Sequence, residues 1–217
     1  MNQALPGTRV GWVRGTQSGD NDAHRIARRV VLIGPLDPND RQRFLSGLGR
    51  ASPESMYKRF MTPLPRLSRT QLAYLLGVDH QDHQALLAIG EDDGEAVAVG
   101  RFVRLEDSPS AAEAAVLVID DWQGFGLGKA VCRLLAERAR QLGIERFETT
   151  MLRSNRAMKT VLESLGAIRV VSDDGTTVTY TVSLPERGVG EHLTGVLRAI
   201  DDGGYQLAAP GETDLDC

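Results

Sequence analysis

Cysteine and long apolar runs are both scarce in this sequence of 217 residues. The two cysteines, Cys132 and Cys217, provide neither a disulfide framework nor the paired spacing of a metal site, which favours a reducing compartment. The N-terminus lacks the apolar segment of a secretory signal, and no apolar run approaches the length of a membrane span. These absences predict a cytoplasmic protein that neither crosses nor binds a membrane.

An excess of positive charge is also missing. The formal net charge is −4, so the chain lacks the basic surface on which nucleic-acid binding depends. Hydrophobic residues make up 41% and charged residues 25%, the composition of a soluble globular protein. A chain of this length buries one substantial core and is short for two full domains. We therefore expect one domain with tails and no nucleic-acid partner.

Glycine is concentrated where an apolar strand gives way to a helix. Residues 116–119 predict a strand, an Asp-Asp pair predicts a turn, and residues 127–142 have apolar side chains at helical spacing. A helix N-terminus with a glycine-rich loop presents free N–H groups and partial positive charge. A phosphate or pyrophosphate is the expected ligand of such a loop. The glycines are Gly124, Gly126 and Gly128.

The spacing of these glycines identifies the kind of loop. It fits neither the dinucleotide pattern G-x-G-x-x-G nor a P-loop, and an ordinary βα turn is the simplest alternative. The pattern Q-x-x-G-x-G, formed by Gln123, Gly126 and Gly128, resembles the coenzyme A pyrophosphate loop of the GNAT acyltransferase superfamily. Asn155, eleven positions before Gly166, is similar to the N-x₁₀-G segment with which that superfamily contacts coenzyme A.

The order of predicted elements agrees with this resemblance and predicts an α/β (α+β) fold, with a mixed central sheet flanked by helices. Residues 1–28 are expected to be a tail that docks a strand through Trp12, residues 29–185 the acetyltransferase domain, and residues 186–217 an extension with one short amphipathic helix. The expected elements are strand 30–33, helices starting near Asp37, Ser52 and Ser68, hairpin strands 85–89 and 96–103, loop 106–111, strand 113–119, helix 127–142, strand 144–152, a helix after Asn155, and hairpin strands 168–171 and 178–184.

Three further segments narrow the resemblance. Residues 52–60, 64–68 and 78–80, together with the pair Ala112-Glu113, resemble bacterial protein lysine acetyltransferases of the Pat type. This resemblance implies a protein lysine as acceptor, for example in an acyl-CoA synthetase, with a small amine as the alternative. The flanking segments are short for a cyclic-nucleotide module, so a stand-alone catalytic domain, as monomer or homodimer, is expected.

The GNAT resemblance also implies acetyl-CoA as cosubstrate and no metal. The polar loop with His80 and His83 has no further ligands nearby, which favours a loop before a strand over a metal site. Phe125 replaces a basic residue that many relatives carry, which predicts somewhat weaker coenzyme binding. The implied coenzyme-binding residues are Val116, Leu117, Val118, Gln123, Gly124, Phe125, Gly126, Leu127, Gly128, Lys129 and Asn155.

The chemistry requires a base. A lysine amine, with an ordinary pKa of about 10.4, cannot attack a thioester until it loses a proton. Glu113 lies among alanines, where burial would raise its basicity, although a solvated glutamate on an edge strand is the alternative. Glu148 on the next strand is the rival base, whereas Asp120 and Asp121 are expected to be turn residues.

A general acid is missing from its usual place. Many GNAT enzymes carry a tyrosine seven residues after the asparagine, where this chain has Leu162. The sequence therefore predicts catalysis without a tyrosine acid, or alternatively an acyl-CoA-binding module that regulates a partner and performs no reaction.

Overall fold

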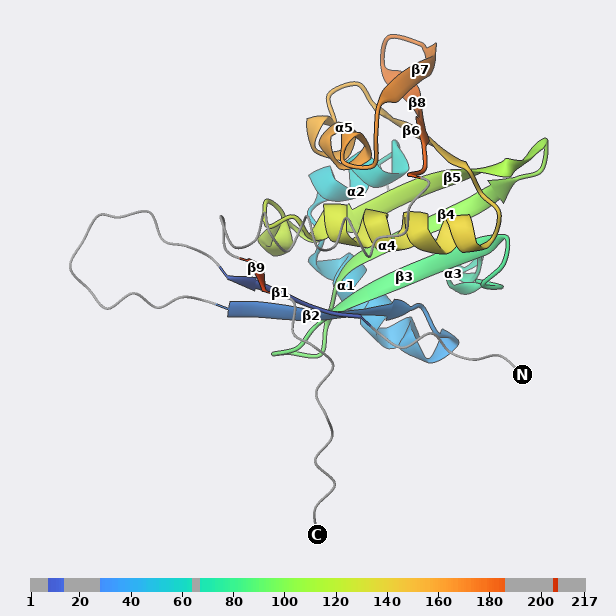
Figure 1. Cartoon of the computed structure of the whole chain (residues 1–217). Coiled ribbons are helices and arrows are strands. Elements are labelled where there is room, and N and C mark those ends of the chain that lie inside the picture. Colours follow the sequence, from blue (N-terminus) through green and yellow to red (C-terminus); the bar gives the residue numbers. More distant parts are fainter. Residues whose placement is uncertain (1–7, 14–27, 64–66, 186–204, 207–217) are drawn as a thin grey trace.

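One mixed sheet with helices on both faces forms the protein (Figure 1). The computed structural model describes residues 8–13, 28–63, 67–185 and 205–206. Across these residues the strand order is β7-β8-β6-β5-β4-β3-β2-β1-β9, and β5–β6 is the parallel pair among antiparallel neighbours. The strands are β1 Thr8–Val13, β2 Arg28–Pro35, β3 His83–Gly90, β4 Ala96–Leu105, β5 Ser108–Val118, β6 Arg146–Leu152, β7 Ile168–Asp173, β8 Thr177–Ser183 and β9 Tyr205–Gln206.

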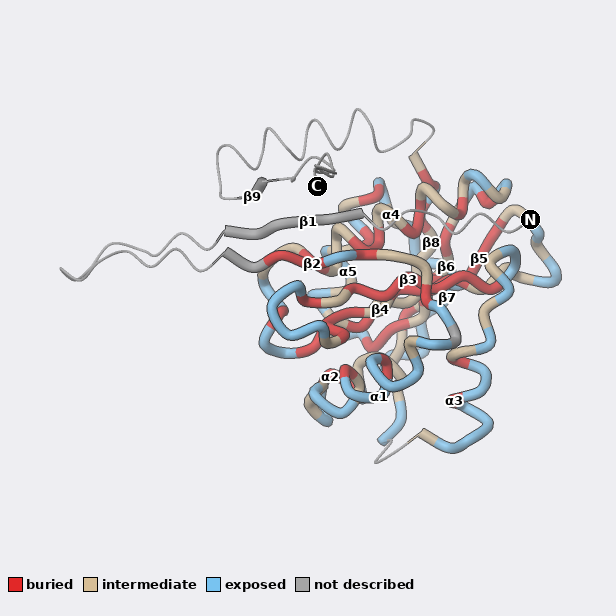
Figure 2. The backbone as a smooth tube through the Cα atoms, turned by 90° about the horizontal axis from the view of Figure 1, so that it is seen from below, coloured by how far each residue is buried: buried red, intermediate tan, exposed pale blue. Residues whose placement is uncertain are grey.

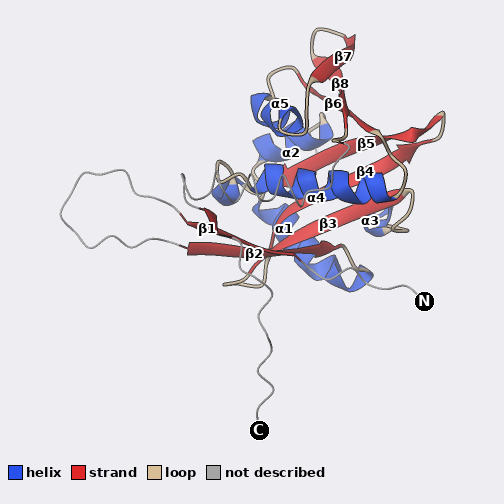
Figure 3. Ribbon diagram, viewed as in Figure 1, coloured by secondary structure: helices blue, strands red, loops and turns tan. Residues whose placement is uncertain are grey.

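The helices form two layers. Helix α4 lies across one face of the sheet, and the three helices between β2 and β3 lie against the other (Figure 3). This arrangement confirms the predicted fold class, a mixed sheet flanked by helices. The helices are α1 Arg41–Arg50, α2 Pro53–Phe60, α3 Arg69–Leu76, α4 Leu127–Gln141 and α5 Arg156–Glu163, with single 3₁₀ turns at Pro38–Asp40 and Asp120–Trp122.

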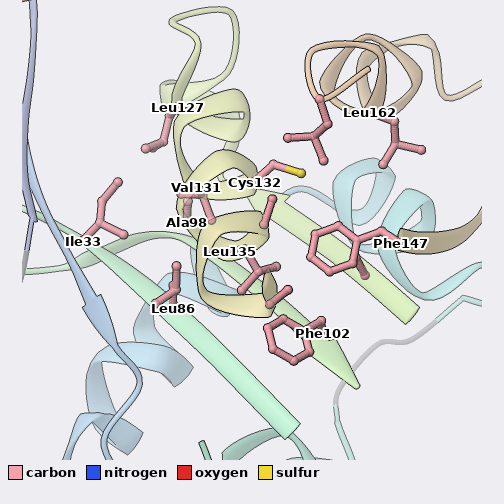
Figure 4. Packing of buried hydrophobic residues seen from close by; sticks show 14 of the residues in the cluster. Ile33, Leu86, Ala98, Phe102, Leu127, Val131, Cys132, Leu135, Phe147 and Leu162 are labelled. Atoms are coloured by element: carbon pink, nitrogen blue, oxygen red, sulfur yellow. The ribbon is translucent and has the colours of Figure 1, made fainter. Parts of the chain in front are cut away.

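Strand β3 is buried on both faces because the layers cover both (Figure 2). Leu86 and Ala88 pack into the core beneath α4, whereas Ala85 and Leu87 pack into a second core against α1 and α3. This is the period-two alternation of a strand, here with apolar residues on both sides. Figure 4 shows the larger core, in which side chains of α4 meet those of β2, β3 and β4.

The predicted helix starts are confirmed because they depend on local capping. The Ser52 hydroxyl accepts a hydrogen bond from the Ser55 N–H at 3.1 Å, and Pro53 occupies the first turn of α2. Ser68 and Gln71 form a reciprocal capping box at the start of α3. Helix α4 ends at Gln141, two residues before Gly143, whose φ of 79° is in the left-handed region.

One predicted loop is wrong. Residues 106–111 were expected to be a loop around Pro109, but β5 begins at Ser108. The proline is tolerated because the register between β4 and β5 shifts between Arg104 and Leu105, beside this residue, and a proline that lacks an N–H fits such an irregularity. The β4–β5 hairpin is therefore longer and its turn tighter than the sequence suggests.

The sequence predicts that residues 1–28 and 186–217 flank the domain as a tail and an extension. The strand expected around Trp12 is present as β1, where Trp12 lies opposite Arg29 of β2. The amphipathic helix expected from Leu193 to Ile200 lies outside the described residues. No helix in the described part of the chain has the length and apolar character that a bilayer span requires.

Candidate active site

The sheet opens between its two parallel strands. Strands β5 and β6 pair over three positions, and the last pair joins Glu113 to Glu148. Beyond it, the Thr149 hydroxyl donates to the Ala114 carbonyl at 2.9 Å, and no described strand pairs with this edge of β5. The remaining five residues of β5, 114–118, border a gap.

Alternation along β5 decides which backbone groups face the gap. The Ala114 and Val118 carbonyls both point to it, since they accept from Thr149 and from the Gln123 amide at 2.9 Å. Val116 lies between them at the same parity, so its N–H and C=O face the gap as well. Leu117 has the opposite parity, and its backbone groups face β4, whereas its side chain lines a cleft.

The glycine loop closes one end of this gap. Gly124 and Gly126 both have φ of 80°, a conformation that side-chain-bearing residues rarely adopt, and Gly126 is the N-cap of α4. At Gly128 a Cβ atom would lie 3.3 Å from the Val161 side chain, so this glycine allows α5 to approach α4. The loop therefore leaves the N-terminus of α4 exposed to a ligand, which is the arrangement that binds phosphate.

A cleft of about 470 Å³ runs over the loop and along the gap. Ten of the residues that line it were predicted to bind coenzyme: Val116, Leu117, Val118, Gln123, Gly124, Gly126, Leu127, Gly128, Lys129 and Asn155. The others come from α2, α5 and the turn after β5, and they are Ser55, Lys58, Arg59, Trp122, Ala157, Met158, Thr160 and Val161.

A hydrogen-bond network ties α2 to the loop. The Asp120 carboxylate accepts from the Ser52 N–H and hydroxyl, both at 2.7 Å, and from the Ser55 hydroxyl at 3.0 Å. The Gln123 amide donates to the Ser55 hydroxyl at 2.9 Å as well as to Val118. Burial acts to raise the pKa of Asp120, but these hydrogen bonds outweigh it and hold the pKa below its ordinary value. Asp120 thus has a positioning role beyond that of a turn residue.

A second cleft, of about 220 Å³, lies on the face covered by α2 and α3. Glu113 lines it, as the alternation of β5 requires, since Ala112 and Ala114 point into the core beneath α4. Arg59 lines both clefts and marks the place where they adjoin. The other residues that line the second cleft are Phe60, Gln71, Tyr74, Leu75, Arg101, Val103 and Ala115.

Comparison with known proteins identifies the family. Residues 53–167, which contain both strands of the gap, the glycine loop and Glu113, match the acetyltransferase (GNAT) family. The chain belongs to the GNAT family. It is 35% identical over 147 residues to "Acetyltransferase Pat" of Mycolicibacterium smegmatis, which covers 68% of this chain and 44% of that protein. It is also 32% identical to "Acetyltransferase PA5475" of Pseudomonas aeruginosa, over 72% of this chain and 85% of that protein.

A solved structure supports the Pat resemblance. The GNAT domain of S. lividans PAT superposes with a TM-score of 0.66 at 31% identity, over 71% of this chain and 91% of that domain. The chain therefore spans less than half of the M. smegmatis protein but most of an isolated Pat GNAT domain.

Two predicted coenzyme residues of this GNAT domain have structural roles. The half-buried Phe125 packs against the main core, and it does not line the cleft. Asn155 lines the cleft, and its side chain also caps α5 by accepting from the Met158 N–H at 3.1 Å. The Asn155 side chain therefore shapes the cleft while its oxygen caps α5, and its NH₂ group is not part of this cap.

The rival base has a different environment from Glu113. Glu148 lies directly opposite Glu113 on the same face of the sheet, because Phe147 points into the core beneath α4. Its carboxylate lies 3.5 Å from the Arg146 guanidinium, and it lines neither cleft. Of these two glutamates, Glu113 lines a cleft and Glu148 does not.

The contribution of α2 and β4 to this GNAT site was not anticipated from the sequence. On α2, Lys58 pairs with Glu54 at 2.5 Å, a spacing that by itself indicates only a solvated helix face. Arg101 is buried on β4, within a run that reads as an ordinary strand. The alternation of Arg101 with buried Ala98 and Phe102 was the available signal, and it requires the register of β4 to interpret.

The missing tyrosine is a core position. Leu162 is fully buried beneath α5, in the same core as Phe147. Its side chain does not line the cleft, to which Ala157, Met158 and Val161 contribute. Among the described residues no three potential metal ligands of the His, Cys, Asp or Glu type gather at one place, and His80 instead contacts Gln84 at 2.6 Å.

Proposed function

We propose that this GNAT domain transfers the acetyl group of acetyl-CoA to an amine, with a protein lysine side chain as acceptor and Glu113 as general base. The observation that carries the proposal is the junction of two clefts at Arg59, beside the gap between β5 and β6. One cleft has the exposed helix N-terminus that suits a pyrophosphate, and the other holds a carboxylate that suits an amine.

The coenzyme would lie in the larger cleft. Its pyrophosphate would accept hydrogen bonds from the backbone N–H groups of the glycine loop, and Lys129 on the first turn of α4 would add positive charge. The pantetheine amides would pair with the Val116 and Val118 backbone groups at the edge of β5. A structure of this fold, yncA of Salmonella typhimurium, 18% identical, contains acetyl-CoA as its cofactor.

The reaction follows from this placement. Glu113, directly or through water, takes a proton from the acceptor ammonium, and the free amine nitrogen then attacks the thioester carbonyl carbon. A backbone N–H of β5 at the gap stabilises the oxyanion that forms. The C–S bond breaks, the coenzyme leaves as a thiolate that takes its proton from water, and the amide product loses its remaining proton to solvent, to which Glu113 also releases its proton before the next turnover. No tyrosine acid is required.

The choice of a protein lysine rests on the Pat relatives rather than on the shape of the cleft. A cytoplasmic acceptor, such as an acyl-CoA synthetase, is consistent with the scarcity of cysteine and of apolar runs. A small amine is the alternative acceptor within the same chemistry.

Release of free coenzyme A thiol from acetyl-CoA tests this proposal. We expect release that depends on an added protein or peptide with lysine, and mass spectrometry should find the acetyl group on a lysine Nζ. Thiol release with small amines and not with proteins or peptides would show that the acceptor is a small amine. Tight acetyl-CoA binding with no transfer to any acceptor would favour a regulatory module and contradict the proposal.

A further inference from the structure

The second cleft contains more positive charge than its own residues balance. Two guanidinium groups, of Arg59 and Arg101, line it together with one carboxylate, that of Glu113. Within the described part of the chain neither arginine lies within ion-pair distance of a carboxylate. Arginines elsewhere on the sheet do find such partners, since Arg104 pairs with Asp82 at 2.6 Å and Arg146 with Glu148.

Arg101 is the more exceptional of the two. It is 6% exposed, and its guanidinium donates to the Leu75 carbonyl at 2.6 Å. The other two nitrogens, Nε and Nη1, are buried with no hydrogen-bond partner. Buried charged groups without partners are costly, and an anion that binds from outside the chain would provide the partner that Arg101 lacks.

The charges around Arg101 point the same way. Burial, together with the positive charge of Arg59, lowers the pKa of Arg101 to about 10. Burial also lowers the pKa of Arg59, which the negative charge of Glu113 partly offsets. Glu113 thus offsets part of the burial of Arg59, whereas only Tyr74 acts in that direction on Arg101 and no carboxylate of the described residues does. An anion placed beside Arg101 would relieve both its burial and its repulsion from Arg59.

We propose that Arg101, together with Arg59, forms an anion-binding subsite of the acceptor cleft, which takes a carboxylate carried close to the acceptor amine. Guanidinium groups bind carboxylates through paired hydrogen bonds, and the ring of Tyr74, 5.7 Å from the Arg101 guanidinium carbon, supports the plane of that group. The preferred acceptor is then a lysine next to an acidic residue, which places the ammonium at Glu113 and the carboxylate at the arginines.

This inference rests on the proposed function and is tested by selectivity. A series of lysine peptides carries a single Glu at each flanking position in turn, each matched to a Gln version. We expect kcat/KM to favour the best Glu peptide over its Gln match by about 10- to 100-fold, the range of hydrogen bonds to charged groups. Free lysine compared with cadaverine, which lacks the carboxylate, tests a small-molecule source of the same anion.

Variants of Arg101 test whether this residue causes the preference for Glu peptides over Gln peptides. In Arg101→Gln the Glu-to-Gln ratio should fall toward one, and Arg101→Lys should restore part of it because the charge is kept without the planar fork. Arg104→Gln, on the same strand, loses hydrogen bonds of similar kind but should keep the wild-type ratio. Mere structural damage at Arg101 would slow both peptides equally and leave the ratio unchanged, which would overturn the proposal.

A binding measurement separates this inference from the proposed reaction. Peptides that already carry acetyl-lysine, in Glu and Gln versions, are titrated calorimetrically into the protein with coenzyme A. Preference for the Glu version that Arg101→Gln removes would support the subsite even if no acceptor is acetylated. Equal affinity for both versions, with no preference for lysine over cadaverine, would overturn it while leaving acetyl transfer intact.

Discussion

The Asp120 carboxylate holds Ser52 through two hydrogen bonds of 2.7 Å, one from its N–H and one from its hydroxyl. Ser52 is the N-cap of α2, and Asp120 opens the turn that leads to the glycine loop. A single carboxylate therefore joins the helix that carries Arg59 to the loop proposed to bind coenzyme. Asp120 therefore helps to position residues that line both clefts.

Asp120→Asn should destabilise the fold by roughly 1 kcal/mol near neutral pH, a modest loss because the carboxylate is exposed to solvent. The folded pKa of Asp120 is depressed, so its contribution is present above the unfolded pKa of about 3.9 and is lost as pH falls through the folded pKa. Urea unfolding at several pH values measures this. The difference in the free energy of unfolding between wild type and Asp120→Asn should disappear in acid. Asp92→Asn, in an exposed turn, should show no comparable difference from wild type.

Gly126→Val should abolish acetyl-CoA binding, because the glycine adopts a left-handed conformation at the N-cap of α4 and a side chain there would distort the loop. Gly143→Val is the matched control, since Gly143 has φ of 79° after the other end of the same helix. Both variants should lose similar stability, of order 1–3 kcal/mol. Undiminished calorimetric affinity for acetyl-CoA in folded Gly126→Val would show that the loop does not bind the coenzyme.

None of Tyr57, Tyr74 and Tyr180 should be indispensable to catalysis, because the position at which many GNAT enzymes carry the tyrosine acid is the buried Leu162. Tyr57 is exposed on α2, Tyr180 packs on the core, and Tyr74 lines the second cleft. Phe substitutions at the three positions should lower kcat by less than tenfold. A loss of roughly a thousandfold at any of them, with acetyl-CoA affinity intact, would identify a general acid that this account lacks.

Local signals predicted much of the fold. Ser52, Ser68 and Gly143 act through hydrogen bonds and dihedral angles within a few residues, so the starts of α2 and α3 and the end of α4 were readable from the sequence. The strand through Pro109 was missed because its tolerance depends on the register with β4, which no local pattern reveals.

The candidate site divides in the same way. The glycine loop is contiguous in sequence, and its residues line the cleft as a group. The second cleft joins Arg59, Arg101 and Glu113 from two strands and a helix, and only the register of β4 and β5 with the packing of α2 brings them together. Glu113 was identified through its resemblance to a family motif, whereas the arginines had no comparable signal.

The central claim is that Glu113 removes the proton from the acceptor amine, and the most direct test is the pH dependence of kcat for Glu113→Gln beside Glu148→Gln. Glutamine keeps the shape of the side chain but takes no proton. We predict that Glu113→Gln binds acetyl-CoA normally, loses roughly 10²–10⁴-fold in kcat and loses the ascending limb of the wild-type pH profile. Glu148→Gln should keep the wild-type kcat and the ascending limb. A normal Glu113→Gln beside an impaired Glu148→Gln would contradict the claim and assign the base to Glu148.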